Sequence, residues 1–160
     1  MSARTKDEVT LEASERLFKK APTIQQLAKL NLLTIQKLIY PVGFYKTKAK
    51  HIRKLSNQIT KVPNTMSELI KLPGVGRKTA NLILNRAYGI PAIAVDTHVH
   101  KISNLLGWVK TKTPEQTEKE LIKILPKKYW SDTNRLFVSI GRQFTSKKKL
   151  EEFLRKEELI

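Results

Sequence analysis

The sequence predicts an all-α protein, and three observations support that fold class. Apolar residues recur at helical spacing along almost the whole chain, and strict two-residue alternation never extends beyond a few residues. Prolines and glycines divide the chain into pieces of helical length joined by short connections. With 40% hydrophobic residues and no apolar run near the ~20 residues of a membrane span, we expect the apolar side chains to fill a core.

The helix boundaries follow from capping residues and prolines. Thr23, Thr65 and Thr113 stand where N-terminal caps are expected, while Pro22 and Pro41 end the helices that precede them. In order, the predicted helices span about 7–20, 24–30, 34–40, 46–59, a start at 65–68, 77–88, 97–106, 115–124, 133–144 and 148–158.

The charge balance points to a polyanionic partner. The 31 Lys and Arg residues outnumber the 14 Asp and Glu residues, for a net charge of +17. Nucleic acid is the favoured partner, although charge alone leaves DNA, RNA and an anionic membrane surface open. The polar start at residues 1–6 lacks the apolar centre of a signal peptide. We therefore expect a cytoplasmic protein, nucleoid-associated in a prokaryote, or a nuclear one, but not a secreted one.

The chain contains no cysteine, which excludes disulfides, thiolate metal ligands and cysteine nucleophiles. The three histidines, His51, His98 and His100, do not by themselves form a metal site. We expect no metal centre.

A glycine-containing turn separates two predicted helices at residues 72–76, Leu-Pro-Gly-Val-Gly. Gly74 and Gly76 frame one apolar residue and permit a tight turn with exposed amides. Such a turn at a helix start presents N–H groups and the positive end of the helix dipole to an anion, and a phosphate fits best. The alternative is that the two glycines only make a tight connection between helices.

Residues 72–81, Leu-Pro-Gly-Val-Gly-Arg-Lys-Thr-Ala-Asn, resemble the helix-hairpin-helix signature of endonuclease III. The resemblance continues through Ile-Ala-Val-Asp-Thr-His-Val at 93–99 and Ser-Asn-Leu-Leu-Gly at 103–107. It also includes Gly-Phe-Tyr at 43–45 and Gly-Arg at 141–142. This resemblance implies a single helix-hairpin-helix glycosylase domain over 1–160, with two helical lobes around a DNA-binding cleft. A helical-barrel lobe of about 5–110 and C-terminal helices of about 113–160 in the second lobe are expected.

The resemblance implies a base-excision-repair DNA glycosylase that also cleaves abasic sites by β-elimination, acting on oxidised pyrimidines in duplex DNA. Lys78 holds the position of the family's lysine, which attacks the anomeric carbon and displaces the base. Asp96 matches the aspartate that helps to activate this nucleophile and stabilises the oxocarbenium-like sugar. Taken singly, Lys78 would be a solvated surface lysine or a phosphate contact, and Asp96 a helix N-cap.

Contacts to DNA are also implied by the resemblance. The hairpin amides are expected to hold phosphates beside a flipped nucleotide, where a monovalent cation can also bridge to phosphate. A residue near the N-terminus is expected to fill the gap left by the flipped base, and basic residues near the C-terminus to contact the backbone. The predicted DNA-binding residues are Gly74, Val75, Gly76, Arg77, Arg4 and Arg142. Arg4 as a frayed terminal residue and Arg142 as a solvated one are the alternatives.

Three further residues favour structural roles. We expect His98 to hold the loop that carries Asp96. Phe44 and Tyr45 are expected to pack against helices.

The sequence departs from the family at both ends. Many endonuclease III relatives carry four C-terminal cysteines that bind an iron–sulfur cluster. Residues 145–160 contain none, so we expect no redox cofactor and a packed helix in the cluster's place, held by Leu150, Phe153 and Leu154. The N-terminus resembles a point well inside typical relatives. A minimal natural form, a truncated chain and a split enzyme whose partner chain supplies the missing helices all agree with this.

Two other functions remain open. Glycosylases for mismatched thymine or uracil and for oxidised purines share this fold, and pocket residues select the base. A helix-hairpin-helix element can also serve as a non-catalytic grip on DNA, which explains the charge and the glycines but not Asp96 at this spacing.

Overall fold

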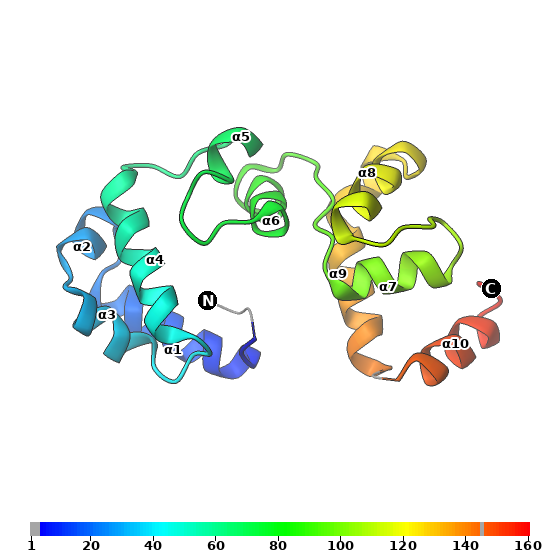
Figure 1. The fold of residues 1–160 in the computed structure, drawn as a ribbon, viewed down its shortest axis with the longest axis horizontal. Coiled ribbons are helices and arrows are strands. Elements are labelled where there is room, and N and C mark those ends of the chain that lie inside the picture. The colour runs from blue at the N-terminus through cyan, green and yellow to red at the C-terminus, as the bar shows by residue number, and fades with distance from the viewer. Residues whose placement is uncertain (1–3, 145) are drawn as a thin grey trace. The chain divides into compact units, whose positions relative to one another are not determined.

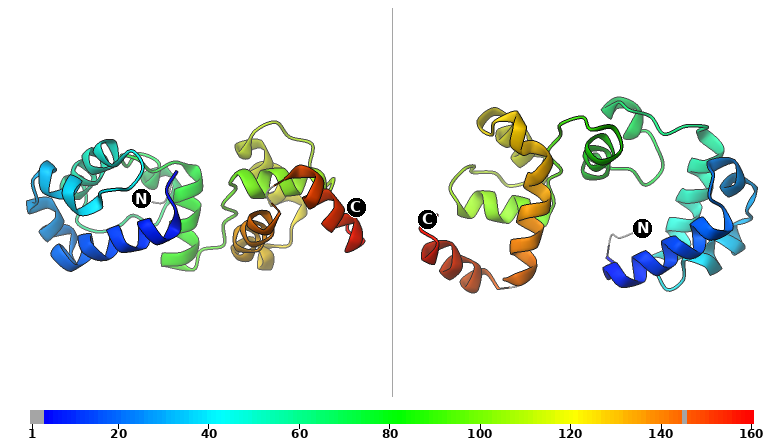
Figure 2. Two further views of the ribbon diagram at one scale, coloured as in Figure 1. Left: turned by 90° about the horizontal axis from the view of Figure 1, so that it is seen from below. Right: turned by 180° about the vertical axis from the view of Figure 1, so that it is seen from behind.

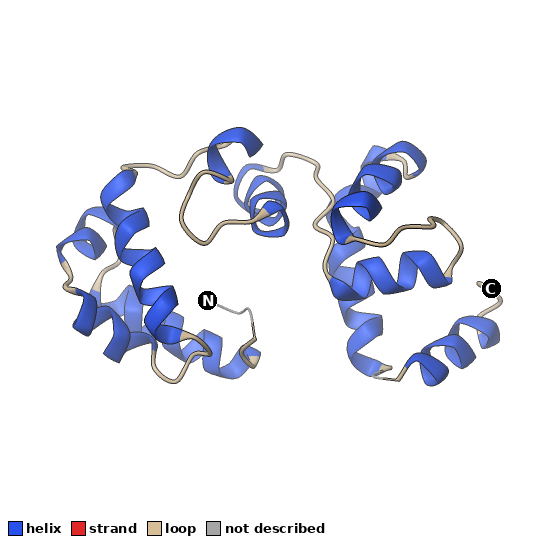
Figure 3. Ribbon diagram, viewed as in Figure 1, coloured by secondary structure: helices blue, strands red, loops and turns tan. Residues whose placement is uncertain are grey.

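The computed structural model describes residues 4–144 and 146–160, and every regular element in these residues is a helix (Figures 1 and 3). The predicted all-α fold class is confirmed. None of the described helices is long and apolar enough to cross a membrane. The helices are α1 Asp7–Lys20, α2 Ile24–Lys29, α3 Leu32–Ile39, α4 Tyr45–Gln58, α5 Met66–Leu69, α6 Arg77–Tyr88, α7 Thr97–Leu105, α8 Pro114–Ile124, η1 Lys127–Tyr129, α9 Trp130–Gln143 and α10 Lys147–Lys156.

The chain forms two compact units. The first unit contains the described residues up to Pro63 together with Glu68–Gly74. The second contains Asn64–Ser67 and Val75–Ile160, so that α6 and α7 belong with the C-terminal helices. The division that the resemblance implies, a helical-barrel lobe of about 5–110 and a second lobe with the helices of about 113–160, stays a prediction.

The first unit is built from α1, α2, α3 and α4 around a small apolar core. The capping residues explain the helix starts, because Thr23 and Gln26 form a reciprocal capping box at α2. Helix α3 begins two residues earlier than predicted because the Asn31 side chain accepts a hydrogen bond from the Thr34 amide at 2.8 Å. The core side chains are Ala13, Leu17, Ile35, Ile39, Val42 and Ala49.

In the second unit, α7 packs against α8 and α9 (Figure 2). Helix α9 begins three residues before its predicted start, after the short turn η1, and the Trp130 indole there donates a hydrogen bond to the Leu125 carbonyl at 2.9 Å. The core side chains are Ile93, Val95, Val99, Ile102, Val109, Leu121, Phe137, Leu150 and Leu154.

Helix α10 is anchored by apolar contacts, as predicted. Leu150 and Leu154 are buried in the core of the second unit. The rings of Phe144 and Phe153 stack with their centroids 4.4 Å apart. These contacts hold the C-terminal helix without any cysteine.

Candidate active site and DNA-contact residues

Lys78 and Asp96, the two predicted catalytic residues, lie together in the second unit. Lys78 is the second residue of α6, directly after the glycine turn, and Asp96 is the N-cap of α7. The Lys78 Nζ atom is 3.5 Å from the Asp96 Oδ2 atom, which makes them an ion pair. The two residues are 18 positions apart in the sequence, so the tertiary fold and not local sequence brings the amine to the carboxylate.

The two oxygens of Asp96 have different partners. Oδ1 accepts hydrogen bonds from the amides of His98 at 2.9 Å and Val99 at 3.0 Å, while Oδ2 faces Lys78. The Asp96 side chain is 12% exposed and that of Lys78 is 48% exposed. Asp96 therefore caps α7 and pairs with Lys78 at the same time, because each role uses a different carboxylate oxygen. The cap also fixes the rotation of the carboxylate.

The turn before α6 has the backbone geometry that its glycines allow. Gly74 has a left-handed backbone with φ of 76°, and a Cβ atom there would lie 2.7 Å from the His51 Nδ1 atom. Gly76 has φ of −95° and is the N-cap of α6, with open space where a Cβ would lie. The first amides of α6 have no acceptor within the helix, as in any α-helix, and they belong to the segment predicted to hold a phosphate.

We expect Gly74→Ala to destabilise the protein by about 1 to 3 kcal/mol, because alanine combines left-handed strain with a clash against His51. The matched control is Gly76→Ala, expected to cost less than about 1 kcal/mol because only the capping preference changes. Urea unfolding of both variants measures the difference. Equal losses would contradict this account of the turn.

Arg77 has a partner within the protein. Its Nε and Nη2 atoms donate hydrogen bonds to the two carboxylate oxygens of Glu118 on α8, at 3.1 and 2.6 Å. The Glu118 side chain is only 6% exposed, and the hydrogen bond to it raises the pKa of Arg77. This bidentate pair fixes the start of α6 against α8. A phosphate contact by Arg77 stays a prediction, and it would use the face of the guanidinium that Glu118 leaves open.

Arg4 and Phe44 form an exposed pair in the first unit. The Arg4 guanidinium lies over the Phe44 ring, 5.5 Å from its centroid. Phe44 is 61% exposed and has φ of 58°, so the prediction that it packs against helices is wrong. Tyr45 does pack against the core and makes an edge contact with Tyr40. Phe44 is thus a surface residue beside Arg4, whereas the sequence had predicted that it packs in the interior.

Arg142 lies in the last turn of α9, on a pocket of about 360 Å³ that also includes Thr97, His98 and Lys101. The His98 ring lies so close to Gly141 that a Cβ there would be 2.1 Å from the Nδ1 atom. Because the His98 amide also bonds Asp96, this residue connects the capping loop to α9. That geometry agrees with the structural role expected for His98.

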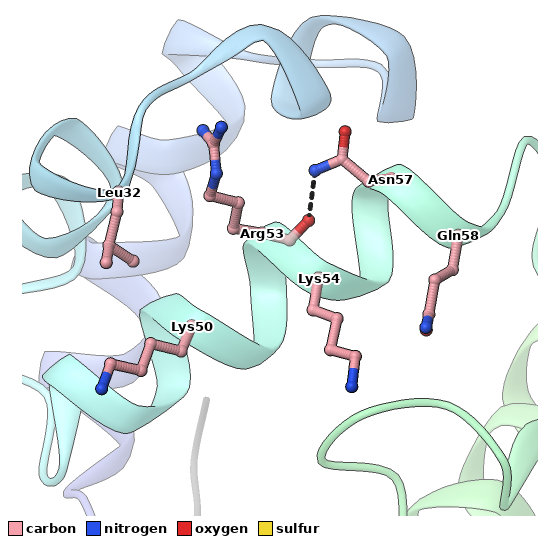
Figure 4. Close-up of a pocket in the computed structure, with 6 residues that line it drawn as sticks. All are labelled: Leu32, Lys50, Arg53, Lys54, Asn57 and Gln58. Carbon is pink, nitrogen blue, oxygen red and sulfur yellow. Dashed lines mark hydrogen bonds between the residues drawn. The ribbon is translucent and has the colours of Figure 1, made fainter.

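A second pocket, of about 380 Å³, lies on α4 in the first unit (Figure 4). The Arg53 guanidinium donates a hydrogen bond to the Leu30 carbonyl, and the Asn57 amide donates one to the Arg53 carbonyl at 2.8 Å. Its lining contains no carboxylate, so it offers no counterpart to the Lys78 and Asp96 pair. The lining residues are Leu32, Lys50, Arg53, Lys54, Asn57 and Gln58.

Metal ligands are not gathered anywhere in the part of the chain that the structure describes: no group of three His, Cys, Asp or Glu side chains could hold an ion. The thiolates that an iron–sulfur cluster needs are missing from the sequence itself. The residues present therefore do not fit such a cluster.

Sequence reasoning missed three asparagines that hold the segment before Asp96. Asn81 and Asn85 lie on the buried side of α6, and Asn134 lies on α9. Buried asparagines four residues apart in a helix are a detectable signal, because a buried amide needs hydrogen-bond partners. The identity of those partners is not readable from the sequence.

A glycine turn that opens α6, with the Lys78 amine of that helix beside the aspartate that caps α7, is the arrangement expected of a helix-hairpin-helix protein of DNA repair. Residues 1–127 match the model of the HhH-GPD superfamily base excision DNA repair proteins, and the chain belongs to that family. It is 48% identical over 148 residues to endonuclease III of Thermotoga maritima, covering 89% of this chain and 70% of that protein. It is 43% identical to endonuclease III-like protein 1 of Mus musculus, covering 89% of this chain.

Solved structures agree with this assignment. A trapped endonuclease III–DNA covalent intermediate matches with a TM-score of 0.85 and 38% identity, covering 91% of this chain and 71% of that one. A thermostable thymine-DNA glycosylase matches with a TM-score of 0.76 at 19% identity, which shows the shared fold. The chain spans 70% of the Thermotoga protein but half of the mouse protein.

Proposed function

We propose that this protein removes damaged bases from duplex DNA as a glycosylase and cleaves the resulting abasic site as a lyase. The observation that carries the proposal is the Lys78 amine 3.5 Å from the Asp96 carboxylate, directly after the hairpin, in a chain of this repair family. A glycosylase with lyase activity needs an amine that forms a Schiff base and a carboxylate that balances developing positive charge. The Lys78 and Asp96 pair supplies both the amine and the carboxylate.

In the proposed reaction, Asp96 takes a proton from the Lys78 ammonium, and the neutral amine attacks C1′ of the damaged nucleotide. The glycosidic bond breaks, and its electron pair leaves with the base, which takes up a proton. The deoxyribose ring then opens to give a Schiff base with Lys78. Loss of a C2′ proton expels the 3′ phosphate, and water releases the lysine.

The target base is hidden in the duplex, so the proposal requires the nucleotide to be flipped out. Arg4 and Phe44 are suited to filling the gap, because both are exposed and already stack on each other. Aromatic and apolar side chains stabilise opened base steps in this way. The hairpin residues Gly74, Val75 and Gly76 are proposed to bind phosphate through their amides, and Arg142 to contact the backbone.

Oxidised pyrimidines are the proposed lesion class, as the resemblance to endonuclease III implies. A mismatch-directed or oxidised-purine glycosylase is the alternative within the fold. A purely DNA-binding module gives no reason for the amine and the carboxylate to meet at a capped helix start. We propose that catalysis needs no iron–sulfur cluster, since α10 packs through Leu150 and Leu154.

A panel of duplexes, each with one lesion, tests the proposed function. The panel contains an oxidised pyrimidine, a G·T and a G·U mismatch, an oxidised purine and an abasic site. We expect strand cleavage at the oxidised pyrimidine and at the abasic site. Cleavage confined to a mismatch or an oxidised purine would redirect the substrate assignment. Binding that weakens steeply with salt, with every duplex left intact, would establish the binding module instead.

A further inference from the structure

The segment that leads to Asp96 is buried and belongs to no helix or sheet. Ala92, Ile93, Ala94 and Val95 are at most 8% exposed, and none of them belongs to a helix or strand. Buried carbonyl groups require hydrogen-bond partners, which helices and sheets normally supply. In this segment the partners must come from side chains.

Three asparagine amides supply them, one to each of three successive carbonyls. Asn85 donates to the Ala92 carbonyl at 3.3 Å, and Asn81 donates to the Ile93 carbonyl at 2.9 Å. From α9, Asn134 donates to the Ala94 carbonyl at 2.8 Å. We call Asn81, Asn85 and Asn134 the asparagine clamp.

The clamp connects the two halves of the candidate active site. Asn81 follows Lys78 by three residues on α6, so the two side chains share a face of that helix. Asp96 lies two residues beyond Ala94, the last clamped carbonyl. The helix that carries the amine therefore holds, by its own side chains, the segment that carries the carboxylate.

We propose that Asn81 and Asn134 are positioning residues that set the register of Asp96 relative to Lys78. They act through Asp96 and do not touch the DNA themselves. Asn85 bonds farther from Asp96 and also donates to the Ser131 carbonyl at 3.2 Å, so its contribution is mainly to the packing of α6 against α9. The inference rests on the proposed function, because it gives the register a catalytic purpose.

Positioning of this kind has a large kinetic effect, since misplacing a reacting group by about 1 Å can lower a rate by about 100-fold. An amide-to-carbonyl hydrogen bond has strict distance and angle requirements, so it fixes the position of the segment along its own direction more closely than the non-directional apolar packing of Ile93 and Val95 does.

The test uses Asn81→Leu and Asn134→Leu, which keep side-chain size close and remove the donor. Under single-turnover conditions, borohydride trapping on abasic-site DNA is expected to slow by about 10- to 100-fold with DNA affinity unchanged. The matched control is Asn104→Leu, which removes an asparagine that bonds Thr111 and His100 elsewhere in the second unit. We expect it to trap at the wild-type rate in protein that is still folded.

To distinguish positioning of Asp96 from a merely structural role, trapping by Asn81→Leu is measured again in an Asp96→Asn background. If Asn81 acts through Asp96, adding Asn81→Leu to Asp96→Asn slows trapping by less than about threefold. The same 10- to 100-fold factor in both backgrounds would overturn the proposal.

Failure of the clamp and failure of the proposed function give different results. If the wild type forms no adduct on abasic DNA, the proposed function fails. The clamp is then judged by crystal structures of wild type and Asn81→Leu: it predicts a Lys78 Nζ to Asp96 Oδ2 separation clearly longer in the variant. An unchanged separation, or unchanged trapping in an active enzyme, would refute the clamp. Asn134→Leu repeats both measurements if Asn81→Leu does not fold.

Discussion

Lys78→Gln is expected to abolish covalent trapping on abasic-site DNA and to lower base excision by about 10⁴-fold or more. Glutamine has a similar length and can still face Asp96, but its amide nitrogen is not a nucleophile and cannot form a Schiff base. Binding to abasic DNA should change little, because one exposed positive charge of a strongly basic protein is lost. The measurement is borohydride trapping together with excision under single-turnover conditions.

Lys123→Gln is the control for the lost charge. Lys123 pairs with Glu120 on the exposed side of α8, and its Nζ atom is 2.7 Å from that carboxylate. The control should trap DNA like the wild type. Undiminished trapping by Lys78→Gln would remove Lys78 from the mechanism.

Asp96→Asn is expected to separate chemistry from stability. Asparagine is as good an N-cap as aspartate, so its side-chain oxygen can still accept from the amides of His98 and Val99. The oxygen that faces Lys78 becomes an amide donor and can no longer accept a proton. We expect excision to fall by about 10²- to 10⁴-fold, the usual contribution of a positioned acid or base, with little change in the unfolding free energy.

Asp96→Ala completes the comparison, because alanine removes both the cap and the carboxylate. It should lose activity like Asp96→Asn and in addition lose about 0.5 to 2 kcal/mol of stability. Thermal or urea unfolding beside single-turnover excision measures both quantities. An Asp96→Asn protein that excises normally, or one that unfolds like Asp96→Ala, would contradict the division of roles between the two oxygens.

The sequence predicts most of the fold because its helix signals are local. Helix α6 begins at Arg77 and ends at Tyr88 as predicted, since Gly76 and Gly89 bound it. Thr113 and Pro114 likewise mark the start of α8. The helix starts that were missed, at Leu32 and Trp130, depend on an asparagine cap and on a turn stabilised by a tryptophan hydrogen bond.

The candidate site was predictable only in part. Lys78 and Asp96 were predicted from the helix-hairpin-helix motif and the residues that follow it, and such a motif does not give the distance between two side chains. The pairing of Arg77 with Glu118 joins residues 41 positions apart, and Asn134 reaches a carbonyl 40 positions away. Such contacts depend on how helices pack, which helical periodicity does not encode. Phe44 was misassigned because its left-handed backbone turns an apolar side chain outward.

The chemistry assigned to Lys78 is tested most directly by locating the trapped sugar. Wild-type protein is incubated with abasic-site duplex and borohydride, the DNA is digested, and the modified peptide is identified by mass spectrometry. The account predicts a reduced deoxyribose adduct on the Lys78 side chain in the peptide that follows the glycine turn. An adduct on any other lysine or on the N-terminal amine, or no adduct in protein that binds the duplex, would contradict it.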